Sequence, residues 1–150
     1  MRPSPDSEPI ALQRIEVIAR SEHLGAIHTA FERIWEVALD WFPTPPGVVW
    51  RAEFETALAE IGANIVKHAS PPEEPCRMRL EMALFGDRIE ATFADNGLPA
   101  TIPEESEPPA DDQESGRGLL IARRALDSVA YARTPDGENT WRLVKKFSNE

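Results

Sequence analysis

The stretch Glu60-Ile-Gly-Ala-Asn-Ile-Val-Lys-His-Ala69 carries two helical patterns at once. Glu60, Asn64 and His68 recur at intervals of four, so on a helix they form one stripe that drifts by only about 40° per step. The two isoleucines of the stretch continue an apolar stripe on the neighbouring face. The pattern predicts a helix that presents polar side chains beside the core. By itself, it is also typical of a solvated helix face.

The elements before this stretch follow from their hydrophobic periods. Residues 12–19 alternate between two faces, which predicts an edge-like first strand. From Ser21, a candidate N-cap, apolar residues recur every three or four positions up to Phe42 and predict a first helix. A second helix is expected at about 48–69, because its apolar stripe continues until Pro71-Pro72 ends it.

The second half of the chain is predicted to form strands around one more helix. Residues 77–85 and 88–94 alternate on either side of Gly86-Asp87, which predicts an antiparallel hairpin. Residues 98–115 are acidic and proline-rich without periodicity, so we expect a long mobile loop. The last expected elements are a helix at about 118–126 and strands at about 129–133 and 141–147, joined by a turn at 135–139.

The composition fits one cytosolic domain. With 150 residues, 41% of them apolar and 28% charged, the chain can bury one core. We expect a flexible segment at 1–11 and one domain at 12–150. The formal net charge of -10 disfavours nucleic acid and anionic membranes as partners, and the apolar runs are too short for a membrane span. Cys76 is the single cysteine and the polar start does not resemble a secretory leader, so we expect the reducing cytoplasm.

Two short motifs follow predicted elements at places where ligands commonly bind. Asp95-Asn-Gly-Leu-Pro99 comes directly after a strand, and there a carboxylate can accept an amine hydrogen bond while a glycine lets a backbone approach a ligand. Gly116-Arg-Gly-Leu119 opens the expected third helix, whose unpaired N–H groups and positive end suit an anion. Each motif has a plain alternative: an Asx turn for the first and a commonplace Gly-x-Gly for the second.

The order of these features resembles a known family. A helix with Glu-x-x-x-Asn-x-x-x-His, a strand ending in Asp-x-Gly, a long loop, Gly-x-Gly-Leu and a closing hairpin are together similar to the GHKL ATPases. These share the Bergerat ATP-binding fold, and within them the chain looks like the anti-sigma-factor serine kinases. The matching stretches are 60–69, 95–99, 116–123, 128–131 and 139–145. The resemblance implies an α+β fold, a two-layer α/β sandwich whose mixed, mainly antiparallel sheet is covered on one face by helices.

The same resemblance implies roles for individual residues. Asn64 would be the side-chain ligand of Mg²⁺ in a Mg·ATP complex, and Glu60 would be the catalytic base facing the substrate serine. Asp95 would accept a hydrogen bond from the adenine amino group, Gly97 would let the backbone approach the purine, and Thr140 would support the same end of the base. The full set implied at the nucleotide is Asn64, Lys67, His68, Asp95, Gly97, Gly116, Arg117, Gly118, Leu119 and Thr140.

An ATP lid is implied at about 98–117, with its phosphate end at the Gly-x-Gly motif. The lid carries six acidic residues that would repel a triphosphate, and only Arg117 opposes them nearby. Lys67 and His68 have ordinary alternatives, because a lysine at a helix end suits the macrodipole and a histidine there can cap carbonyls.

The function implied is that of a protein-serine kinase. It would bind a sigma factor, release it when a small antagonist protein competes, and inactivate that antagonist by phosphorylation; a homodimer is implied as well. The alternative is a noncatalytic ATP-dependent binding module. Glu60 favours the kinase, whereas the acidic lid favours the module. A histidine-kinase catalytic piece is disfavoured, because no long dimerising helix with a phosphoacceptor histidine precedes the ATP-binding region.

Overall fold

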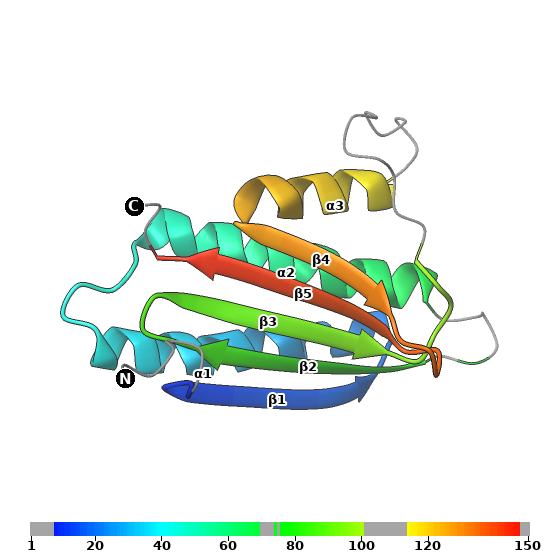
Figure 1. Ribbon diagram of the computed structural model, residues 1–150, viewed down its shortest axis with the longest axis horizontal. Helices are drawn as coiled ribbons and strands as arrows, with labels where there is room; N and C mark the ends of the chain where they lie inside the picture. Colours follow the sequence, from blue (N-terminus) through cyan, green and yellow to red (C-terminus); the bar gives the residue numbers. More distant parts are fainter. Residues whose placement is uncertain (1–7, 70–73, 75, 101–113, 148–150) are drawn as a thin grey trace.

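The computed structural model describes residues 8–69, 74, 76–100 and 114–147, the last range without the side chains of 114–116. Its elements are β1 (Ala11–Ile18), a short 3₁₀ turn η1 (Ser21–His23), α1 (Gly25–Trp41), α2 (Val48–His68), β2 (Arg77–Leu84), β3 (Arg88–Asp95), α3 (Glu114–Ala125), β4 (Ser128–Arg133) and β5 (Asn139–Lys146). The strands form one sheet in the order β1-β2-β3-β5-β4, and the helices cover one of its faces (Figure 1). The predicted α+β two-layer sandwich is confirmed.

The core lies between the sheet and the helices. Alternate residues of the inner strands point toward the helices, so Leu80 and Phe93 are almost wholly buried and meet the apolar faces of α1 and α2. Phe31 and Phe54 bring those two helices together, with ring centroids 5.6 Å apart. Burial of aromatic side chains this large supplies much of the energy that holds such layers. α2 therefore sits in the middle of the helical layer, with α1 on one side and α3 on the other.

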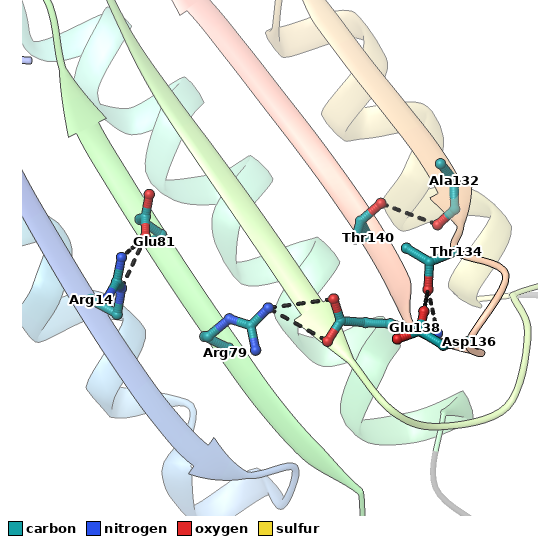
Figure 2. Close-up of polar contacts among 8 residues, drawn as sticks. All are labelled: Arg14, Arg79, Glu81, Ala132, Thr134, Asp136, Glu138 and Thr140. Atoms are coloured by element: carbon teal, nitrogen blue, oxygen red, sulfur yellow. Dashed lines mark hydrogen bonds and ion pairs between the residues drawn. The ribbon is translucent and has the colours of Figure 1, made fainter. Parts of the chain in front are cut away.

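The opposite face of the sheet is open and polar. Ion pairs line it, including Arg14 of β1 with Glu81 of β2 at 2.5 Å and Arg79 of β2 with Glu138, in the turn before β5, at 3.4 Å (Figure 2). Exposed pairs of this kind add little stability, but they keep an uncovered sheet face hydrophilic. Among the described helices, none combines the length and apolar character needed to cross a bilayer.

Three expectations need correction. Ser21 starts the 3₁₀ turn η1 rather than capping the first helix, because Leu24 N–H bonds to Ser21 O and α1 begins only at Gly25. The third helix begins at Glu114, four residues before the expected start at Gly118. The four strand pairings of the described sheet are all antiparallel, where a mixed sheet was expected.

Parts of two expectations lie outside the described residues. These are 1–7 of the expected flexible N-terminal segment and 101–113 of the expected lid. The remaining elements agree with the predicted ones to within a few residues at their ends, and β1 lies at an edge of the sheet as expected.

Candidate functional site

Helix α2 presents the predicted polar stripe on one side. Glu60 and Asn64 are half-buried on this helix, whereas Lys67 and His68 are exposed in its last turn. Glu60 and Asn64 are four residues apart, about one helical turn, so their side chains are neighbours on a face that borders the core. The half-burial of these two side chains distinguishes them from ordinary solvated residues.

Glu60 lies against α3. A Cβ placed on the buried Gly118 would come within 2.5 Å of Glu60 Oε2, so a larger residue there would displace the end of the Glu60 side chain. Gly116 and Gly118 both lie inside α3 rather than before it, contrary to the expectation that they open the helix. In an α-helix that begins at Glu114, Gly116 falls in the first turn, whereas the Gly118 amide is engaged within the helix. Leu119 is buried beneath them and Arg117 is exposed.

Asp95 ends β3 and is buried to 2% exposure. Its Oδ1 accepts hydrogen bonds from Gly97 N–H at 2.9 Å and from Asn139 Nδ2 at 2.8 Å. Both bonds reach the same oxygen, and within the described part of the chain no hydrogen bond reaches Oδ2. Burial raises the pKa of the Asp95 carboxyl above its ordinary value, and the bond from Asn139 is the strongest opposing effect. The residue combines an Asx turn with a carboxylate oxygen left over for a ligand.

Gly97 joins the Asp95 turn to the end of α2. A Cβ on Gly97 would lie 2.2 Å from the carbonyl oxygen of Ala69, an impossible approach for any other residue. The next amide, Leu98 N–H, donates to that same oxygen at 2.6 Å. The turn that carries Asp95 is therefore fixed beside the C-terminal turn of the helix that carries Asn64. This contact is a structural reason for the glycine, in addition to the expected approach to a purine.

Thr140 does not lie with Asp95 and the other candidate residues of the site. It pairs with Ala94 across the sheet, whereas its neighbour Asn139 pairs with Asp95. Because successive side chains of a strand point to opposite faces, Thr140 lies on the open face, where its hydroxyl donates to Ala132 O at 3.2 Å (Figure 2). The expected support of the base by Thr140 does not match this placement.

Asn139 is the site residue that sequence reasoning missed. It is 1% exposed and contacts Asp95 directly. A signal was present, because alternation places Asn139 on the same face as Trp141 and Leu143, which makes it a polar residue among core residues. Such a residue must find buried partners.

A second polar cluster lies between α1 and α2. Potential ligand atoms of His28, Glu32 and Glu55 lie within 4.8 Å of one another. Arg51 already bonds both carboxylates, donating from Nε to Glu55 at 2.8 Å and from Nη2 to Glu32. A guanidinium in this position neutralises the acids that a cation would need. Beside the cluster is a cavity of about 110 Å³, lined by His28, Glu55 and apolar residues. Its lining belongs to α1, α2 and Leu24.

The sheet, the polar stripe on α2 and the Asp-x-Gly turn together define an ATP-binding domain of the Bergerat type. A family model described as the histidine kinase-like ATPase domain matches residues 7–145. The match spans most of the 150 residues, so the chain belongs to this family and binds ATP. No curated protein matches the chain significantly. The roles given to individual residues at the nucleotide and in catalysis stay predictions: Glu60, Asn64, Lys67, His68, Asp95, Gly97, Gly116, Arg117, Gly118 and Leu119.

The close contact of Gly97 with Ala69 predicts a selective effect of adding one methyl group. Gly97→Ala should lower the free energy of unfolding by about 1–3 kcal/mol, because the backbone must move to relieve the overlap. Gly86→Ala is the matched control, since a Cβ there meets nothing within 4 Å. Urea denaturation measures both. Equal midpoints for the two variants would contradict the packing described for the turn.

The raised pKa of Asp95 predicts a pH-dependent stability difference. The folded chain holds this proton more tightly than the unfolded chain, so Asp95 destabilises the fold as the pH rises above about 4. Asp95→Asn keeps an oxygen for both Oδ1 bonds and removes the charge. We therefore expect this variant to gain stability relative to the parent between pH 4 and pH 7 in urea denaturation. The exposed Asp40→Asn should show no such gain, and a pH-independent difference for Asp95→Asn would contradict the account.

Proposed function

We propose that the chain is an ATP-dependent serine-protein kinase of the anti-sigma-factor type, which binds a regulatory partner and phosphorylates a serine of a small antagonist protein. The observation that carries this proposal is the position of Glu60 and Asn64. They are adjacent and half-buried on α2, whose last residues are joined to the turn of Asp95. The proposed acid and oxygen ligand thus lie on one helix, and the proposed base-recognition carboxylate lies beside a turn that is bonded to the end of that helix.

The adenine end of the proposed site is Asp95. Its Oδ2 is available to accept the amino group of adenine, while Oδ1 is held by the protein. A hydrogen bond to a charged acceptor is worth roughly 1.5–3 kcal/mol. Guanine carries a carbonyl oxygen in place of that amino group and offers no donor there. Asp95 therefore favours adenine over guanine.

The phosphate end of the proposed site lies between α2 and the start of α3. Asn64 offers a neutral oxygen, which fits a Mg²⁺ ion that keeps several waters and takes few protein ligands. The metal, when bound with the nucleotide, offsets phosphate charge. Gly116 lies in the first turn of α3, where amides lack intrahelical acceptors, and the exposed Arg117 adds a positive charge. Lys67 and His68 lie at the end of α2 as further candidates.

Glu60 is proposed as the general base. It would orient the serine hydroxyl of the antagonist protein and take its proton as the oxygen bonds to the γ-phosphorus and ADP leaves. Gly118 supports this position, because the absence of a side chain there leaves room for the Glu60 carboxylate beside α3. The carboxylate is held by packing on one side, which limits the orientations it can adopt.

Partner binding is part of the proposal. We expect a cytoplasmic homodimer that binds the antagonist protein and, as a second partner, a sigma factor. Support comes from exposed apolar side chains at the end of α1 and the start of α2, namely Leu39, Trp41, Val48 and Val49. Val48 and Val49 are 81% and 74% exposed. Large apolar side chains exposed to this degree are candidates for contacts with another protein.

A noncatalytic ATP-dependent binding module is the second candidate. The contact between Glu60 and Gly118 favours it, because a carboxylate packed against α3 can act as a spacer between two helices without any chemistry. In that case nucleotide would only set the shape of the partner surface.

Glu60→Gln separates the two candidates. The amide keeps the size of the side chain and its packing on Gly118, so ATP affinity should stay as in the parent. Single-turnover phosphorylation of a small antagonist protein encoded nearby should slow by about a hundred- to ten-thousand-fold, the usual contribution of a general base. Calorimetry with ATP and radiolabel transfer measure the two quantities.

Glu53→Gln is the control for this experiment. Glu53 is on the same helix but faces Lys145, with 3.8 Å between Nζ and Oε1. It should keep both ATP affinity and the transfer rate. A parent chain that transfers no phosphate to any serine of a partner it demonstrably binds would replace the kinase with the binding module.

A further inference from the structure

Asn139 is the centre of a buried hydrogen-bond network at the adenine end of the site. It is the first residue of β5 and is 1% exposed. Its Nδ2 donates to Asp95 Oδ1 at 2.8 Å, to Leu98 O at 2.8 Å and, more weakly, to Gly97 O at 3.3 Å. One side-chain amide therefore reaches both the proposed recognition carboxylate and the backbone of the residues that follow it.

The side-chain oxygen of Asn139 accepts hydrogen bonds from two residues of β4. Asn139 Oδ1 accepts from Arg133 Nη1 at 2.8 Å and from the hydroxyl of Tyr131. A guanidinium can only donate and a carbonyl can only accept, so the orientation of the amide is fixed by its partners. The Tyr131 hydroxyl also accepts from Ala100 N–H at 3.0 Å.

This geometry has a direct consequence for Asp95. Asn139 and the Gly97 amide both bond Oδ1, which sets the rotation of the carboxylate and leaves Oδ2 for a ligand. The backbone at Leu98 and Ala100 is attached to the same network. Asp95 and the three residues after its turn are thus positioned as one unit from two strands of the sheet.

We propose that Asn139 is a positioning residue for base recognition, which aims the free oxygen of Asp95 at the amino group of adenine. The inference rests on the proposed role of Asp95 and adds a residue that acts through it. Tyr131 and Arg133 act one step further away, because they hold the amide of Asn139 in its donating orientation.

The charges around Asp95 agree with this role. Burial raises the pKa of Asp95, while the hydrogen bonds from Asn139 and Gly97 and the charge of Arg133 lower it. Glu138, in the turn before β5, acts in the raising direction. At the end of α2, Ala69 contacts this turn and carries no charge. Loss of the Asn139 donor therefore raises the pKa of Asp95 further, so the carboxylate becomes protonated at a higher pH.

The test compares Asn139→Ala with Asn96→Ala. Asn96 is the neighbour of Asp95, but its side chain accepts from Arg77 N–H at 2.9 Å, so the control makes the same chemical change in the same turn. Calorimetric titration with Mg·ATP is run from pH 5 to pH 8. Asn139→Ala should weaken binding by about tenfold or more at pH 7.5, the value of one hydrogen bond to a charged group. It should also move the acidic loss of affinity to higher pH, whereas Asn96→Ala should change neither.

Tyr131→Phe keeps the test decisive if Asn139→Ala fails to fold. It removes one donor to Asn139 and retains the ring, which packs on Trp141 at a centroid distance of 4.8 Å. We expect a smaller loss of ATP affinity and the same direction of pH shift. Parental affinity and pH profile in Asn139→Ala, or in Tyr131→Phe where the alanine variant is unfolded, would overturn the inference and leave the proposed function standing. A parent chain that binds no ATP would overturn both.

Discussion

The contact between Gly97 and Ala69 is the constraint on which the site depends. A strand end and a helix end meet there with no side chain between them, and the Leu98 amide closes the contact with a 2.6 Å hydrogen bond to Ala69 O. The carboxylate of Asp95 is placed by the sheet, whereas Asn64 is placed by α2. Only a close, rigid connection between the two layers keeps these groups in one geometry, which is what recognition of a single ligand requires.

The helix α2 serves two neighbours at once. One face packs toward the sheet, where a Cβ on Gly62 would lie 3.8 Å from Phe93, and Glu60 on another face meets α3 at Gly118. The polar stripe therefore lies at the edge of two packed interfaces, which explains its half-burial. Asn139, at the start of β5, donates a hydrogen bond to Asp95 and so fixes that carboxylate from the sheet. The result is a site whose polar groups are fixed by secondary structure, while the open face of the sheet remains occupied by its own ion pairs.

Much of this arrangement could be predicted from the sequence. Helix α2 is predicted by its strong helical period of apolar residues. The β2–β3 hairpin is predicted by two alternating stretches on either side of the turn residues Gly86-Asp87. The start of α3 could not be predicted, because two glycines are typical of a helix opening, and only packing against α2 explains a helix that runs through Gly118. Thr140 was assigned by its place in a motif, whereas strand alternation puts it on the open face. Alternation marks Asn139 as a polar residue on the buried face of its strand, but its partners Asp95 and Leu98 lie far away in the chain, so the sequence does not show what it binds.

The central claim is that Asp95 and the end of α2 form a site for an adenine nucleotide. Its most direct test is calorimetric titration of the unmodified chain with Mg·ATP and with Mg·GTP under identical conditions. One hydrogen bond from the adenine amino group to a buried carboxylate predicts that ATP binds roughly tenfold or more tightly than GTP. Equal affinities for the two nucleotides, or no binding of either, would contradict the account.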